Sequence, residues 1–169
     1  MAREIERKFL VASDFWRAIA GDGEHLIQGY FAKLELAVIA PVIRVRVVGN
    51  RGFLTIKGRP CGINRSEFEY EIPFEDAQAM LREFCGNRVV EKIRYSLPAG
   101  DGLIWEIDEY LEQNQGLFTA EIELPSEDTS FLRPEWLGEE VTGDPRYTNA
   151  ALSCQPYSLW ALNLPKNQV

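Results

Sequence analysis

Histidine and cysteine, the side chains that most often hold zinc or build disulfide frameworks, are scarce in this chain of 169 residues. Its one histidine is His25, and its three cysteines, Cys61, Cys85 and Cys154, lie too far apart to form a C-x-x-C pair. We therefore expect neither a zinc site nor a disulfide framework. The cysteines are predicted to be reduced thiols and His25 to be a structural residue.

Basic residues are also in short supply. The chain has 18 lysines and arginines against 26 acidic residues, which gives a formal net charge of -8. A general nucleic-acid or anionic-membrane surface needs a dense basic patch, so we expect no partner of either kind. The N-terminus carries no apolar run of the signal-peptide type, and no stretch approaches the length that spans a bilayer. We expect a soluble, cytoplasmic protein.

What the chain does contain is a series of short segments in which polar and apolar residues alternate. Such alternation is typical of half-buried strands. Eight strands are predicted, at about residues 2–12, 24–36, 42–48, 53–58, 65–72, 88–97, 103–110 and 118–124. Helices are predicted at about 14–20 and 75–85, with helical turns and loops after residue 125. The short connections suit antiparallel neighbours, so the expected fold is mainly β (α+β), with enough strands to close a barrel.

On each predicted strand the polar and charged residues fall on one face, because side chains alternate between the two faces of a strand. The opposite faces are largely apolar. The charged face comprises Glu4, Glu6, Lys8, Arg44, Arg46, Thr55, Lys57, Arg65, Glu67, Glu69, Glu71, Lys92, Arg94, Glu106, Asp108, Glu121 and Glu123.

This two-sided pattern allows two arrangements of a closed barrel. In an ordinary barrel the apolar faces point inward and the charged faces meet water. Two features favour the inverse, a charged lumen with the helices packed outside. The helices need an apolar surface, which outside a barrel only the outer face of the sheet provides. Arginines and carboxylates also segregate by strand, so basic and acidic strands are predicted to line opposite walls.

A lumen that holds many charges predicts a ligand, because an unpaired buried charge carries a heavy desolvation penalty. Carboxylates without histidine or cysteine favour a hard divalent cation, Mg2+ or Mn2+. Arginines and lysines favour a polyanion, and guanidinium groups suit phosphate oxygens in particular. The chain has no P-loop pattern, so side chains are expected to hold the phosphates. The combined prediction is a metal ion with a chain of phosphates.

The order of these short motifs resembles that of the CYTH family of triphosphate tunnel metalloenzymes, over about residues 2–152. The motifs that carry the resemblance are Glu4-x-Glu6-x-Lys8, Gln28-Gly29-Tyr30, Arg44-x-Arg46, Thr55-x-Lys57, Glu69-x-Glu71, Glu91-Lys92-x-Arg94-Tyr95, Glu121-x-Glu123, Gly138-Glu139-Glu140-Val141 and Arg146-Tyr147-x-Asn149. The resemblance implies a closed, antiparallel, eight-stranded tunnel over residues 1–155. It leaves residues 156–169 as a C-terminal tail, whose apolar part could form a helix on the body.

The resemblance also implies a role for individual residues. The side chains expected to hold the triphosphate are Lys8, Arg44, Arg46, Lys57, Lys92 and Arg94. Those expected to hold metal are Glu4, Glu6, Asp108, Glu121 and Glu123. Lys8 is expected to work beside Tyr30 in orienting or deprotonating the attacking water. Glu69 and Glu71 fit the acidic wall, a structural or solvent role is preferred for Glu67, and Arg146 is expected to anchor the C-terminal segment, with a phosphate contact as the alternative.

The function implied is metal-dependent hydrolysis of a small triphosphate, with inorganic tripolyphosphate converted to pyrophosphate and orthophosphate. Two family alternatives stay open, a class IV adenylate cyclase and a thiamine triphosphatase. A non-catalytic polyphosphate-binding module is the alternative from another class. The sequence alone decides neither the physiological triphosphate nor whether Lys8 or a metal-bound water is the base, and it leaves a homodimer open.

Overall fold

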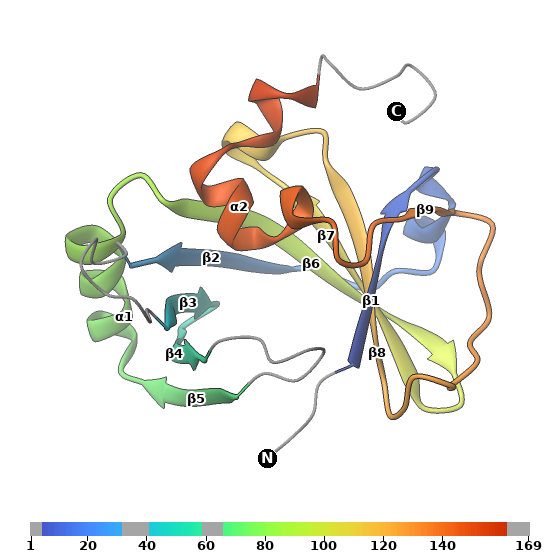
Figure 1. The fold of residues 1–169 in the computed structure, drawn as a ribbon, viewed down its shortest axis with the longest axis horizontal. Coiled ribbons are helices and arrows are strands. Elements are labelled where there is room, and N and C mark those ends of the chain that lie inside the picture. Colours follow the sequence, from blue (N-terminus) through green and yellow to red (C-terminus); the bar gives the residue numbers. More distant parts are fainter. Residues whose placement is uncertain (1–4, 32–40, 59–65, 162–169) are drawn as a thin grey trace.

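The structure, a computed structural model, describes residues 5–31, 41–58 and 66–161. These residues form one antiparallel sheet of nine strands in the order β5-β4-β3-β2-β6-β7-β8-β1-β9 (Figure 1). The strands are β1 (Ile5–Val11), β2 (Glu24–Tyr30), β3 (Val42–Val48), β4 (Arg51–Lys57), β5 (Glu67–Ile72), β6 (Val89–Gly100), β7 (Leu103–Tyr110), β8 (Phe118–Leu124) and β9 (Leu137–Glu140). The prediction of a mainly β, antiparallel fold is confirmed.

The prediction of a closed barrel with eight strands is wrong. The ninth strand, β9, pairs with β1 at Phe9 and Val11 and takes the edge that closure would have used. In the described part of the chain, β5 and β9 are the two edges of the sheet, and nothing joins them. The sheet twists strongly, so that β1 and β8 run across the direction of β2 and β6 in Figure 1. The result is a curled, open sheet around a central space.

The two predicted helical segments lie on the outer face of this sheet, as expected. The predicted helix at 75–85 is α1 (Phe74–Met80), which continues as one π-helical turn, η2 (Leu81–Cys85). Ala77 and Cys85 pack against Val45 and Val47 of β3. The predicted helix at 14–20 is a short 3-10 helix, η1 (Asp14–Ala18). The remaining helical segments are η3 (Glu112–Asn114), η4 (Pro145–Tyr147), α2 (Asn149–Cys154) and η5 (Tyr157–Leu159).

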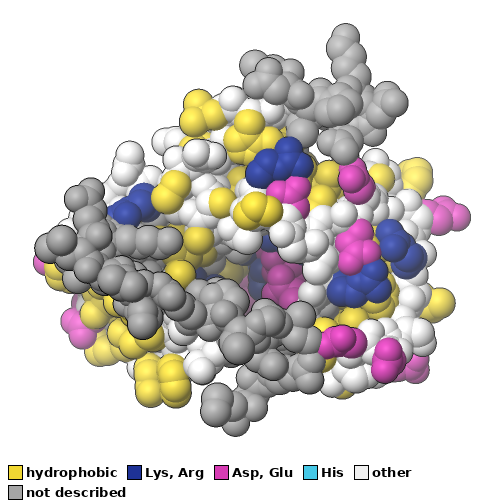
Figure 2. All heavy atoms as spheres, in the orientation of Figure 1, with side chains coloured by type: hydrophobic (Ala, Val, Ile, Leu, Met, Phe, Trp, Pro, Cys, Tyr) yellow, Lys and Arg dark blue, Asp and Glu magenta, His cyan; other side chains and the backbone are white. Residues whose placement is uncertain are grey.

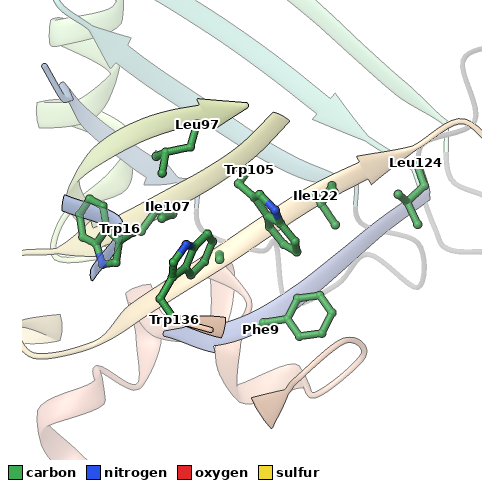
Figure 3. Close-up of a cluster of buried hydrophobic side chains, with 9 residues drawn as sticks. Phe9, Trp16, Leu97, Trp105, Ile107, Ile122, Leu124 and Trp136 are labelled. Atoms are coloured by element: carbon green, nitrogen blue, oxygen red, sulfur yellow. The ribbon is translucent and has the colours of Figure 1, made fainter. Parts of the chain in front are cut away.

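The largest hydrophobic core also lies on the outer face, against β1, β6, β7 and β8. Trp105 is at its centre and meets Phe9 and Trp136 edge-on, with ring centroids 5.7 and 5.6 Å away (Figure 3). Further buried members are Trp16, Leu97, Ile107, Ala120, Ile122 and Leu124. These residues alternate along their strands with charged residues such as Lys8, Asp108 and Glu121. The charged faces are therefore turned toward the central space, so the predicted orientation of the two faces holds although the sheet is open.

The C-terminal segment packs on the body as far as residue 161. Tyr157 donates its backbone N–H to Asn114 Oδ1 at 2.8 Å, and Trp160 meets the rings of Tyr147 and Tyr157 edge-on. Residues 162–169 of the predicted tail lie outside the described residues.

Cys85 and Cys154 are free thiols, as expected, whereas Cys61 lies outside the described residues. Among the described residues, no helix has the length and apolar character needed to cross a bilayer.

Candidate active site

A cavity of about 980 Å³ occupies the central space of the curled sheet. Figure 2 shows it as a hollow near the middle of one face, with acidic and basic side chains inside. The predicted site residues that line it are Glu6, Lys8, Tyr30, Arg44, Arg46, Lys57, Glu69, Lys92, Arg94, Glu121 and Glu123. They come from strands that are distant in the sequence, and the curl of the sheet brings their charged faces together.

The first group of cations belongs to β3 and β4. Arg44 donates to Thr55 Oγ1 at 3.1 Å and to Glu69 Oε2 at 3.1 Å, while Arg46 donates to Glu69 Oε1 at 3.0 Å. Thr55 is fully buried and donates to Glu69 in turn, at 2.7 Å. Burial raises the pKa of the Glu69 carboxyl, but the Thr55 hydrogen bond and the charges of Arg46 and Arg44 outweigh it and hold the pKa below its ordinary value. Glu69 is therefore an ionised acceptor shared by two arginines.

Arg46 has a further distinction in this group. Its Nε atom is buried and has no hydrogen-bond partner within the described part of the chain. Its guanidinium group lies over the Phe53 ring, with its central carbon 5.1 Å from the ring centroid. Burial, followed by the charge of Arg44, lowers the pKa of Arg46 from its high ordinary value. A buried donor of this kind suits an anionic oxygen that enters the cavity.

The second group of cations belongs to β6. Arg94 donates through Nε and Nη2 to the two carboxylate oxygens of Asp108, at 2.7 Å each, and through Nη2 to Glu121 at 2.9 Å. It also donates to Glu106. Lys92 is almost fully buried and pairs with Asp108 Oδ2 at 2.5 Å. Burial and the charge of Arg94 lower the pKa of Lys92 to about 8, even though Asp108 acts in the opposite direction.

Lys8 connects β1 to this second group. Its Nζ lies 2.8 Å from Glu121 Oε1, and both side chains are almost buried. Burial disfavours the ammonium form, but the negative charges of Tyr110 when ionised, of Glu121 and of Asp108 outweigh burial and raise the pKa of Lys8. Burial likewise opposes ionisation of Glu121, yet Lys8 and Arg94 hold its pKa well below the ordinary value. Lys8 is accordingly an ammonium and Glu121 a carboxylate at neutral pH.

Tyr30, at the end of β2, lies among these charges. It is the register partner of Arg44, and its hydroxyl accepts a hydrogen bond from Gln28 Nε2 at 3.0 Å. Burial raises the pKa of Tyr30 to about 12, although the charges of Arg44 and Lys8 oppose the shift. The Tyr30 hydroxyl is therefore neutral at physiological pH and can act as a hydrogen-bond donor.

The carboxylates of the cavity suit a metal ion that takes few ligands from the protein. Among the described residues, no group of three or more His, Cys, Asp or Glu side chains is placed to hold one. Glu6 is opposite Glu123 in the β1–β8 register, and Glu106 is opposite Glu121 in the β7–β8 register. Like charges in direct opposition repel each other. Arg94 bridges Glu106 and Glu121 and reduces the repulsion between them. A divalent cation would reduce the repulsion between the carboxylates further. Mg2+ commonly takes one or two carboxylates and completes its shell with water and phosphate oxygens, so these residues fit such an ion.

The prediction of separate acidic and basic walls is wrong. The acidic strand β5 is next to the basic strand β4, and its glutamates pair with the cations of β3 and β4. Acidic β7 is likewise next to basic β6. The acidic strands therefore lie at both sides of the basic ones. Strand order decides which charges meet, and the sequence pattern does not contain the strand order.

Four predicted site residues are placed differently from the rest. Glu4 lies outside the described residues. Asp108 is fully buried beneath the cavity and is engaged by Lys92 and Arg94. Glu71 pairs with Arg51 in an exposed ion pair, and Arg146 pairs with Asp144 at 2.7 Å. Asp108, Glu71 and Arg146 are not among the residues that line the cavity.

The cavity also contains residues that the sequence reasoning left out. Glu67, which we expected to have a structural or solvent role, lines it and pairs with Lys57 at 2.7 Å. Glu106 lines it as well and bonds Arg94. Strand alternation placed both on the charged face, so the signal was present. Thr142, after β9, is a further lining residue, and its hydroxyl accepts a hydrogen bond from the Lys8 backbone N–H at 2.9 Å. No local sequence pattern predicts this contact.

Known proteins are similar in sequence to this chain over most of its length. The model of the CYTH domain family matches residues 2–148. The chain belongs to the CYTH domain family. It is 46% identical over 158 residues to an inorganic triphosphatase of Acetivibrio thermocellus, which covers 93% of this chain and 97% of that protein. It is 39% identical over 156 residues to an inorganic triphosphatase of Nitrosomonas europaea, covering 89% of this chain and 96% of that protein.

A solved structure agrees with this assignment. The crystal structure of an inorganic triphosphatase superposes on this CYTH protein with a TM-score of 0.65 and 36% sequence identity, over 90% of this chain and 95% of that one. The family resemblance inferred from the charged motifs is confirmed.

Proposed function

We propose that this CYTH domain protein is a metal-dependent triphosphatase that hydrolyses inorganic tripolyphosphate to pyrophosphate and orthophosphate. The observation that carries the proposal is the charged cavity, in which six of the lining residues are cationic: Lys8, Arg44, Arg46, Lys57, Lys92 and Arg94. The identity of 46% and 39% to two inorganic triphosphatases supports the choice of reaction.

The cations would hold the phosphate chain from both sides. Arg44 and Arg46 approach from β3, and Lys92 and Arg94 approach from β6, with the strand β2 between them. Planar guanidinium groups bind two phosphate oxygens at once, so they can fix the direction of the chain as well as its charge. The unpartnered Nε of Arg46 offers a buried donor that a phosphate oxygen can satisfy.

The carboxylates proposed to supply one or two ligands to Mg2+ or Mn2+ are Glu6, Glu121 and Glu123 among the described residues, together with Glu4. When bound, such an ion neutralises charge that develops on the phosphate oxygens and lowers the pKa of a bound water. Asp108 is proposed to act on this site indirectly, since it holds Lys92 and Arg94 in place.

Lys8 and Tyr30 are proposed to orient the attacking water and the terminal phosphate. Both are hydrogen-bond donors at neutral pH, because the pKa of Lys8 is raised and that of Tyr30 is about 12. Donors aimed at oxygens on which charge develops stabilise the transition state of phosphoryl transfer. In this arrangement the two side chains position the reactants.

Product analysis tests the proposal. The purified chain is incubated with tripolyphosphate, ATP or thiamine triphosphate in the presence of MgCl2, and the products are separated by ion chromatography. Equal amounts of pyrophosphate and orthophosphate from tripolyphosphate are expected. Cyclic AMP from ATP would instead identify a cyclase, preferential cleavage of thiamine triphosphate would change the substrate, and binding without turnover would reduce the protein to a polyphosphate-binding module.

A further inference from the structure

The strand β2 brings no cation to the cavity. It lies between β3, which carries Arg44 and Arg46, and β6, which carries Lys92 and Arg94. After the exposed Glu24 at its start, the same face of β2 carries Leu26, Gln28 and Tyr30, which are only 2%, 1% and 9% exposed. Of these, Tyr30 reaches the cavity lining. Gln28 is thus a fully buried amide directly beside the proposed catalytic tyrosine.

The Gln28 amide is directed at the Tyr30 hydroxyl. Residues two apart share one face of a strand, and Gln28 Nε2 donates to the Tyr30 hydroxyl oxygen at 3.0 Å. A buried amide that lacks a hydrogen-bond partner is destabilising, so this hydrogen bond explains why a polar residue is tolerated at this buried position. Together with Arg44, another donor beside this hydroxyl, it also determines which way the tyrosine bonds. Because the amide nitrogen can only donate, the phenolic hydrogen of Tyr30 is left for another acceptor.

The charged groups that face Tyr30 provide little competition for that hydrogen. Arg44 and Lys8, whose charges act on Tyr30, have only donors. Glu121 is the acceptor that acts on Tyr30, and its Oε1 accepts from Lys8 while its Oε2 accepts from Arg94. The phenolic hydrogen is therefore available to an oxygen atom in the cavity, whether of a phosphate or of a water.

The opposite face of β2 is packed against a helical turn at Gly29, which lies between Gln28 and Tyr30. A Cβ atom on Gly29 would lie 2.5 Å from Cys85 Sγ and 2.8 Å from Leu81 Cδ2, so the π-helical turn η2 packs directly on the β2 backbone. Such close packing fixes the backbone on which Gln28 and Tyr30 stand.

We propose that Gln28 is a positioning residue, which holds the Tyr30 hydroxyl so that its hydrogen is donated to the oxygen of the substrate or of the attacking water. The inference rests on the proposed triphosphatase function and adds a residue that acts only through Tyr30. Gln28 itself does not touch the reacting atoms.

A double-mutant cycle tests this assignment. Gln28→Met keeps the shape of the side chain but removes the amide, and it is made in the wild-type and Tyr30→Phe backgrounds. Turnover of tripolyphosphate with MgCl2 is measured for the four proteins, and thermal melting confirms that each is folded. Gln28→Met is expected to lower kcat about tenfold, as the loss of one hydrogen bond allows, with KM changed less than about twofold. In the Tyr30→Phe background the same change should alter kcat less than about twofold.

A second pair of variants covers folding and the direction of the bond. If Gln28→Met does not fold, Gln28→Asn replaces it, because its amide is one methylene too short to reach the hydroxyl. Gln28→Glu accepts instead of donating, so it should draw the phenolic hydrogen away from the cavity and lower kcat although a hydrogen bond remains. A wild-type kcat for Gln28→Glu would overturn the assigned direction.

The remaining outcomes separate this inference from the function on which it rests. Equal losses of kcat in the two backgrounds, or no loss in either, would overturn the assignment of Gln28 while leaving an active triphosphatase. A wild-type protein that turns over no triphosphate would overturn both.

Discussion

Arg44 and Arg51 make similar ion pairs with glutamates of β5, but only Arg44 lines the cavity. The Arg44 side chain is 14% exposed, whereas that of Arg51 is 59% exposed. Arg44→Ala is expected to lower kcat/KM for tripolyphosphate by about 10- to 100-fold, since a hydrogen bond to a charged group contributes roughly 1.5–3 kcal/mol. Steady-state kinetics measures this, with Arg51→Ala as the matched control that should retain wild-type rates. Equal losses in the two variants would mean that the arginines contribute only general charge.

Individual residues also show how far the sequence could be interpreted. Alternation predicted the charged face correctly because the strand period is two, so any residue on that face could be named without a structure. It could not distinguish Glu67 from Glu71, which are equally distant from Glu69. Glu67 lines the cavity while Glu71 pairs with an exposed arginine, because the cavity ends part-way along β5. Where a cavity ends depends on how the whole sheet curls.

At the scale of elements, the contact between β2 and η2 predicts a stability effect. Gly29→Ala places a methyl group within 2.8 Å of Cys85 and Leu81, so one element must shift. Overpacking of this kind costs about 1–3 kcal/mol. Urea denaturation should show this loss in the free energy of unfolding. Gly21→Ala is the control, because nothing lies within 4 Å of the added atom, and it should unfold at the wild-type urea concentration.

The short strand β9 predicts a pH effect. Arg7 of β1 holds Glu140 of β9 through a two-pronged ion pair, and the Arg7 hydrogen bond lowers the pKa of Glu140 although burial opposes it. A depressed native pKa means that this contribution is present above the unfolded value of about 4.3 and is lost as the pH falls through the native value. Glu140→Gln should therefore lower Tm at pH 7 by a few degrees at most, since a partly exposed pair contributes about 1 kcal/mol or less.

The measurement is a series of melting curves from pH 7 to pH 2 for the two proteins. Their Tm values should differ at pH 7 and converge below about pH 4. A difference that persists unchanged to pH 2 would show that the charge of Glu140 has no part in it.

The sequence did not predict β9 because the strand has four residues, two of them adjacent glutamates, and no apolar alternation. Its strand conformation comes from pairing with β1.

For the whole molecule, the charge of the cavity predicts that activity requires a divalent cation. Turnover should be lost in excess EDTA and restored by MgCl2 or MnCl2, because the substrate is highly anionic and the available acidic ligands are oxygens. Calcium should restore it poorly, since its longer and looser coordination would misplace the reactants. Orthophosphate release after dialysis checks this, and a melting curve in EDTA serves as the control for folding. Full turnover in EDTA would remove the metal from the proposal.

The open sheet marks the limit of prediction at this scale. The number of predicted strands was close, but closure depends on strand tilt and stagger and on what pairs with each edge. Those quantities are set by contacts between distant segments, such as β1 with β9, which alternation does not encode. The helices at 14–20 and 75–85 were more informative, because an apolar helical face needs an apolar partner and so indicated which side of the sheet faces outward.

β1 is synthesised before the other strands of this sheet, yet it pairs with strands that are synthesised much later. Ile5 is opposite Leu124 of β8, and Phe9 is opposite Glu140 of β9. Pairings of such long sequence separation form slowly, because a large loop must close before any contact is gained. We therefore expect β1 to remain unpaired in the nascent chain until β8 has emerged. Lys8 meets Glu121 only then, so the contact of β1 with the Arg94 side of the phosphate site should be among the last to form.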